Sequence, residues 1–169
     1  MLEKWKNNRE EMLNIRKTKE FRKKSGKQTD YSYLYNLTET EKAYIAGIID
    51  GEGNMSLSKM SNSEVSYRVN LYISNTNKEL INWLHHKFRN GVIYTVKSVG
   101  NRKQCYKYNL CHNLGANIIK VVFPYLIVKR EQAKLILDYW DNRFGRYDGE
   151  IFKDKIKYLN QRGINETNL

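Results

Sequence analysis

The sequence IAGIIDGEG, residues 45–53, is the most informative stretch of this 169-residue chain. It has the pattern of a helix that closes with a carboxylate, Glu52, between two glycines that free the backbone to turn. One helix face carries small residues on which a second helix can pack closely, namely Ala43, Ala46 and Gly47, followed by Asp50. Two copies of this helix would bring two Glu52 carboxylates together, and these would repel each other unless a divalent cation lay beside them.

This stretch resembles the motif of the LAGLIDADG homing endonucleases, and Tyr44 before it and residues 54–58 after it also fit that family. The resemblance implies a site-specific endonuclease that hydrolyses phosphodiester bonds of double-stranded DNA at a long, partly palindromic site. It also implies that Glu52, at the eighth motif position, binds a divalent metal ion together with the carbonyl oxygen of Gly51. The family more often has Asp at this position, and Glu keeps an oxygen ligand on a longer side chain.

The same resemblance implies Mg²⁺ as the cofactor, with Mn²⁺ as a substitute and Ca²⁺ supporting binding without cleavage. In this family, chains with one motif form homodimers, because the active site straddles a pair of motif helices. The motif occurs once in this chain. We therefore expect a symmetric dimer whose interface contains Ala43, Ala46, Gly47 and Asp50.

The formal net charge of +12 favours a polyanionic partner, for which nucleic acid is the usual choice. Ribosome-associated and membrane-surface proteins share this trait, but they do not explain the motif. Cys105 and Cys111 lack the spacing of a metal site, and no His pair completes one. Reduced cysteines, with no signal peptide or transmembrane run, lead us to expect an intracellular, reducing compartment such as a bacterial cytoplasm or an organelle matrix.

We divide the chain into a basic N-terminal extension (1–37), an endonuclease domain (38–160) and a polar tail (161–169). Residues 1–28 contain ten Lys or Arg and four Glu, and the resulting charge of +6 is half of the net charge of the chain. Two interpretations of this segment stay open: phosphate contacts that lengthen the DNA footprint, or a solvated, frayed terminus.

The order of elements predicts an α+β fold with a four-stranded antiparallel sheet, as in the LAGLIDADG endonuclease core. Thr38 and Glu41 form a capping-box pattern before the motif helix, and Thr76 and Glu79 repeat it before a second helix that Gly91 ends. Period-2 alternation predicts strands over 54–60, 66–75, 92–99 and 103–111. Further helices are predicted over about 114–123, 129–144 and 150–159.

In the family, the concave face of the sheet lies in the major groove, where each base pair presents a distinct pattern of donors and acceptors. The polar strand faces should therefore read DNA. Arg68 suits guanine, Asn70 suits adenine, and the other candidates are Ser56, Ser58, Tyr72, Lys97, Lys103 and Lys107.

Two further catalytic candidates come from the resemblance. Lys129 follows the apolar turn 124–128 and matches a family lysine that lies near the scissile phosphate. Asn75, at the end of the second predicted strand, matches a polar position that contacts active-site water. A second function also stays open at this point. The chain could be a nucleic-acid-binding protein of the same superfamily that does not cleave its target, such as an intron maturase or a DNA-binding module.

Overall fold

The computed structural model describes residues 29–61, 66–98, 100–101, 103–143 and 149–161. The basic segment 1–28 and the tail from residue 162 lie outside the described residues, and so do the interpretations placed on them. Within the described part, one helix and two strands are followed by a second helix and two more strands, and three helices complete the chain. The predicted α+β order is thus confirmed.

A four-stranded antiparallel sheet forms the centre of the molecule, with the strand order β1-β2-β4-β3. The strands are β1 (Gly53–Lys59), β2 (Tyr67–Asn75), β3 (Val92–Val96) and β4 (Cys105–Cys111). The last two are shorter than the sequence predicted, because pairing stops at Val96 opposite Cys105. Lys97 and Lys103 therefore lie just outside the sheet, in the connection between β3 and β4.

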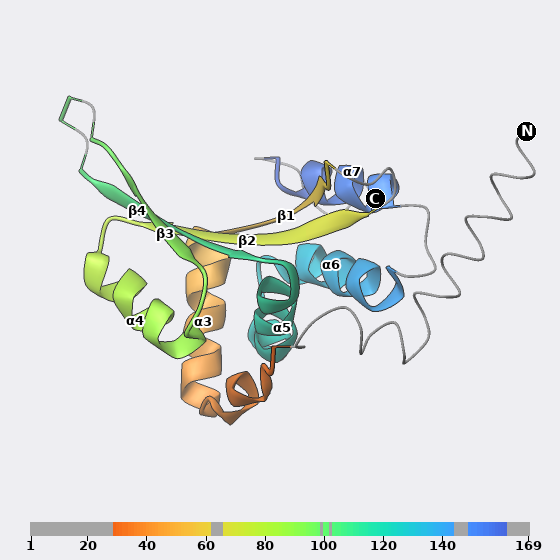
Figure 1. Cartoon of the computed structure of the whole chain (residues 1–169), viewed down its shortest axis with the longest axis horizontal. Helices are drawn as coiled ribbons and strands as arrows, with labels where there is room; N and C mark the ends of the chain where they lie inside the picture. The colour runs from red at the N-terminus through yellow and green to blue at the C-terminus, as the bar shows by residue number, and fades with distance from the viewer. Residues whose placement is uncertain (1–28, 62–65, 99, 102, 144–148, 162–169) are drawn as a thin grey trace, which may run out of the picture.

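Helices α3, α4, α5 and α6 cover one face of this sheet, whereas the opposite face is concave and, of the described helices, has α7 on its side in this view, next to β1 (Figure 1). Helix α7 lies along β1 at the edge of the sheet. The helices are α3 (Glu39–Glu52), α4 (Lys78–Phe88), α5 (His112–Val122), α6 (Arg130–Asn142) and α7 (Gly149–Leu159), with 3₁₀ turns η1 (Ser32–Asn36) and η2 (Phe123–Tyr125). No helix of the described residues is long and apolar enough to span a membrane.

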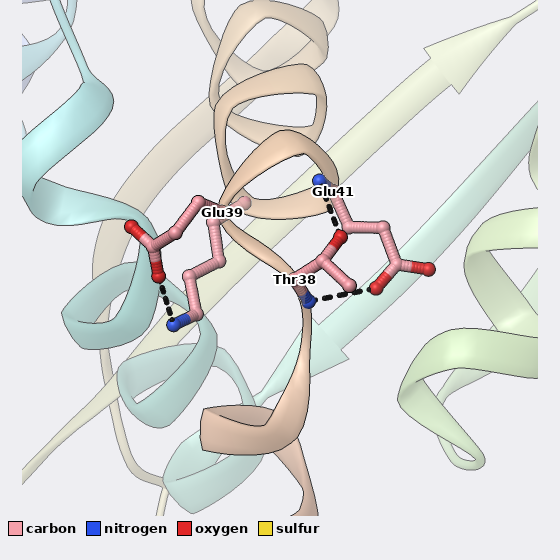
Figure 2. Close-up of polar contacts among 4 residues, drawn as sticks. Thr38, Glu39 and Glu41 are labelled. Carbon is pink, nitrogen blue, oxygen red and sulfur yellow. Dashed lines mark hydrogen bonds and ion pairs between the residues drawn. The ribbon is translucent and has the colours of Figure 1, made fainter.

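The start of α3 forms the predicted capping box (Figure 2). The Glu41 N–H donates to Thr38 Oγ1 at 3.2 Å, and the Thr38 N–H donates to the Glu41 carboxylate at 2.9 Å. Glu39 forms an ion pair with Lys42 on the next turn. The two capping-box bonds satisfy two backbone donors that have no partner within the helix. The first residue of the motif helix therefore follows from local chemistry.

The caps of α4 correct two predictions. Its N-cap is Asn77, whose side-chain oxygen accepts from the Leu80 N–H at 3.1 Å, and not Thr76. Its C-cap is Arg89, which adopts the left-handed conformation with φ of 56°, two residues before the predicted end at Gly91. Asn is among the best N-cap residues, and it competes directly with the Thr one position earlier.

The hydrophobic core lies between the sheet and the helices, and it includes a residue before the predicted domain boundary at 38. Leu34 of η1 is fully buried in the core, and Tyr33 donates a hydrogen bond to the Phe88 carbonyl. The folded domain therefore begins by η1, so the boundary of the predicted extension at residue 37 is too late.

Candidate active site and nucleic-acid interface

Glu52 is the last residue of α3, and its side chain is exposed. The chain passes directly from this helix into β1 at Gly53, where a Cβ would lie 2.5 Å from the carbonyl oxygen of Ile49. Only glycine fits this junction without a rearrangement of the backbone. Among the described residues, the Glu52 carboxylate has no hydrogen bond and no ion pair. Its oxygens are therefore available to a ligand from outside the chain.

Asp50 uses its carboxylate to hold a segment that lies far away in the sequence. The Ile127 N–H donates to Oδ2 at 2.8 Å, and the Lys129 N–H donates to Oδ1 at 2.9 Å. These bonds fix the turn between η2 and α6 against the end of α3. We predicted Asp50 in a dimer interface, and this stays a prediction; within its own chain, both carboxylate oxygens accept hydrogen bonds from backbone N–H groups.

This anchor holds Lys129 at the end of α3 that carries Glu52. Its ammonium donates to the carbonyl oxygen of Asp50. Partial burial lowers the pKa of Lys129, whereas the nearby carboxylates of Asp50 and Glu52 act in the opposite direction. Two residues predicted to be catalytic, 77 positions apart in the sequence, thus lie within electrostatic reach of each other.

Asn75 ends β2 at the same end of the sheet. Gly53, which follows Glu52, pairs with Ile73 of β2. Asn75 lies two residues further along β2 from Ile73. Its side-chain oxygen accepts from the Asn77 N–H at 2.8 Å, which leaves the amide nitrogen as the remaining polar group. The position is compatible with a contact to active-site water.

The donor chemistry of this site fits a divalent metal ion of the Mg²⁺ type, which prefers carboxylate and carbonyl oxygens. The Glu52 carboxylate has no hydrogen bond or ion pair among the described residues. At the preceding residue, Gly51, a Cβ would meet no atom within 4 Å, so the space beside it is open. The described residues contain no cluster of three or more His, Cys, Asp or Glu that could hold a metal ion by themselves. A metal ion held at Glu52 would therefore need further ligands from outside the described residues.

The exposed face of α3 consists of Thr40, Ala43, Tyr44, Gly47 and Gly51, which we call the open face. A Cβ at Gly47 or Gly51 would meet no atom within 4 Å, so packing inside this chain requires neither glycine. Ala46 was predicted in the interface, but it is fully buried in the core of its own chain. The open face is therefore rotated around the helix from the predicted stripe, toward Tyr44 and Gly51.

The concave face of the sheet carries most of the side chains predicted to read DNA. Residues of β2 alternate as expected, with Val69, Leu71 and Ile73 buried on the helix side. On the other side, Arg68 is exposed, and the Lys107 ammonium of β4 lies 4.4 Å from the ring centroid of Tyr72. Ser56 of β1 is half-buried on the same face, and Asn54, which the prediction missed, is exposed two residues before it.

Asn70 does not belong to the exposed part of this face. It is 2% exposed, and its amide donates to Ser58 Oγ at 2.9 Å and to the Arg68 carbonyl. The prediction that Asn70 reads adenine is therefore wrong for this conformation, and the Ser58 hydroxyl is engaged by the same bond. Strand β2 has a neighbouring strand on each side, and their side chains can bury a polar residue such as Asn70. The alternation of residues along one strand does not reveal this burial.

Replacing Asp50 with Ala should release the segment 127–129 and lower the free energy of unfolding by about 2 kcal/mol, because two backbone donors lose a charged acceptor. The change should be measured by denaturant unfolding. Asp138→Ala removes an exposed carboxylate from α6 and serves as the matched control, with an expected effect below about 0.5 kcal/mol. Equal stability of the two variants would show that Asp50 does not anchor this segment.

No protein-family model matches the sequence, and no curated protein matches it. Solved structures, however, match the fold of this chain. The chain superposes on the homing endonuclease I-CvuI, crystallised with an I-CreI target DNA and magnesium, with a TM-score of 0.58 and 20% identity over 76% of this chain and 87% of that chain. A DNA complex of the archaeal intron-encoded homing endonuclease I-Vdi141I gives a TM-score of 0.57 and 17% identity over 76% and 89% of the two chains.

The LAGLIDADG homing endonuclease I-SmaMI, bound to cleaved DNA, gives a TM-score of 0.51 and 19% identity. The match covers 74% of this chain but only 45% of that one. The chain therefore has the fold of the LAGLIDADG homing endonucleases, as the resemblance of residues 45–53 predicted. At these identities the comparison establishes the fold, and the activity has to be argued from the site.

Proposed function

We propose that this protein is a LAGLIDADG homing endonuclease of the single-motif type, which acts as a homodimer and hydrolyses both strands of a long, partly palindromic DNA site. The observation that carries the proposal is the position of Glu52. This carboxylate is exposed at the end of the motif helix, has no hydrogen bond or ion pair among the described residues, and lies within electrostatic reach of Lys129. A protein that only bound nucleic acid would gain nothing from such an uncommitted carboxylate beside a lysine.

The open face of α3 supports the dimer. Glycine inside a helix costs about 1 kcal/mol relative to alanine, and this chain contains two such residues whose surroundings are open. Close approach of a second α3 would explain both, since small residues let helix backbones meet. A twofold axis along this face would place the two Glu52 residues near each other. The coverage of 87% and 45% in the two comparisons is consistent with one chain forming half of an active unit.

A divalent metal ion, Mg²⁺ by preference and Mn²⁺ as a substitute, would supply Lewis-acid activation of water and of the phosphate at this site. Glu52 and the carbonyl of Gly51 would hold it. The Lys129 ammonium would offset the negative charge that develops on the phosphate oxygens, because Asp50 fixes its position before substrate arrives. The Asn75 amide would orient a water molecule at the same end of the sheet.

The concave face would lie in the major groove, which admits a β-ribbon and exposes every base pair distinctly. Arg68 and Lys107 give this face positive charge, and Ser56, Asn54 and Tyr72 provide adaptable hydrogen-bonding groups. Lys97 and Lys103, outside the strands, would contact phosphates and not base edges. Asn70 and Ser58 are left out of this set for the reasons given above.

Selection and cleavage together test the proposal. Full-length protein should enrich specific duplexes from a randomised library in Ca²⁺, and the enriched duplex should be cut on both strands when Mg²⁺ replaces Ca²⁺. Cleavage should stop when a chelator is added. Selective binding without cleavage in Mg²⁺ or Mn²⁺ would instead identify a DNA-binding module or an intron maturase, and a duplex library that yields no enrichment would refute the DNA interface as well.

A further inference from the structure

Strand β3 exposes an apolar row made of Val92, Tyr94 and Val96. These residues are 51%, 51% and 49% exposed, respectively. Alternate residues of a strand project to the same side of the sheet, so the three form one continuous row. We call them the β3 row.

The row lies on the concave face, as the strand register shows. Tyr94 pairs with Lys107 of β4, and residues directly opposite each other in antiparallel strands project to the same side. Lys107 contacts the ring of Tyr72 on the concave face. On the other side, Ile93 pairs with Tyr108, which is fully buried in the core. The β3 row therefore shares its face with the basic residues and borders them directly.

An exposed apolar row on an edge strand is unusual. β3 pairs only with β4 in the described sheet, and edge strands normally carry charged residues that prevent association. Val and Tyr give the strand its conformational preference, but that preference does not require all three to face outward. The row therefore calls for a partner with apolar groups that also attracts the neighbouring positive charge.

We propose that the β3 row reads thymine through its C5-methyl group, an inference that rests on the proposed function. The major groove presents this methyl group as its apolar feature, and it does so between two rows of phosphates. Charge complementarity thus brings the face to DNA through Lys107 and Arg68, while the row contacts the methyl groups. The specificity assigned here is for thymine at those positions of each half-site that lie under β3.

The spacing agrees with this assignment. Alternate residues of a strand are about 6.7 Å apart, and two base-pair steps of DNA rise about 6.8 Å. Val92, Tyr94 and Val96 would therefore meet every second base pair over a stretch of about five. Burying one methyl group is worth about fourfold in affinity, so a fully matched site would gain tens-fold.

Replacement of thymine by uracil tests the proposal, because it removes the methyl group and leaves the pairing edge unchanged. Duplexes enriched by the wild-type protein in Ca²⁺ should contain thymine at positions under β3. Uracil at each of these positions should weaken binding by about fourfold. The double variant Val92→Thr/Val96→Thr keeps the β-branched shape of both side chains but replaces a methyl group with a hydroxyl group. It should bind the thymine duplex about tenfold more weakly and lose most of its sensitivity to uracil.

Thr95→Val is the matched control, since Thr95 lies on the opposite side of the same strand and pairs with Tyr106. It should keep the wild-type response to uracil. Equal binding of thymine and uracil duplexes by wild-type protein would overturn the inference and leave the proposed function standing. Failure to select any duplex would overturn both. DNA-independent association of the wild-type protein that the double variant abolishes, with uracil having no effect, would assign the row to a protein contact instead.

Discussion

The Glu52→Gln protein should bind its DNA target in Ca²⁺ within a few-fold of wild type and should cut it at least about a hundredfold more slowly in Mg²⁺. Glutamine keeps the shape of the side chain but removes the negative charge that a divalent ion needs. Metal activation of a phosphate is worth several kcal/mol, and each 1.4 kcal/mol is a factor of ten in rate. The fold should not change, because the Glu52 carboxylate has no partner among the described residues of its own chain.

Glu39→Gln is the control for this experiment. It removes a carboxylate from the same helix at the opposite end, where the exposed Glu39 side chain pairs with Lys42. Its rate should match that of wild type. Single-turnover cleavage of the enriched duplex, together with titration of the same duplex in Ca²⁺, gives both quantities. A Glu52→Gln protein that cuts at the wild-type rate would remove Glu52 from the mechanism.

The Gly47→Leu protein should be a folded monomer without cleavage activity. A Cβ at position 47 meets no atom within 4 Å in its own chain, so the larger side chain fits the isolated domain. Replacing a helical glycine should even raise the free energy of unfolding of the monomer by about 0.5–1 kcal/mol. In a twofold interface the substitution occurs twice, and overpacking at about 1–3 kcal/mol per site should weaken the dimer at least about thirtyfold.

Sedimentation equilibrium over a range of protein concentrations measures this change, and denaturant unfolding reports on the monomer. Lys134→Leu places the same side chain on the exposed surface of α6 and should leave the dimer intact. A wild-type protein that sediments as a monomer both free and on its DNA would contradict the dimer. A Gly47→Leu protein that is dimeric and fully active would show that the interface lies elsewhere.

The features that could be predicted from the sequence are those that local chemistry determines. The capping box of Thr38 and Glu41 and the alternation of buried and polar residues along β2 depend on neighbours a few positions away. Lys129 was singled out only through resemblance to a family, since no local pattern joins it to Glu52, the carboxylate within whose electrostatic reach it lies.

The errors concern the orientation of elements relative to one another. Ala46 is small, yet it faces the core of its own chain, because the sheet and α5 determine which side of α3 is covered. The partners of Asp50 within the chain could not be predicted either. They are the N–H groups of Ile127 and Lys129, in a turn that only the tertiary fold brings near. Asn70 has the composition of a base-reading residue but lies buried between two neighbouring strands.

The alternation of the two faces of β3 and β4 has a consequence for how such a protein changes over generations. Ile93 and Tyr108 hold the sheet to the core, whereas Val92, Tyr94 and Val96 point the other way and contribute no core packing. If the proposed function holds, a single substitution in the outward set would alter the preferred target while the proposed roles of Glu52 and of the open face of α3 stay intact. When the DNA sequence of a target site changes, substitutions in β3 alone could restore binding, and no intermediate protein would have to be unfolded or inactive.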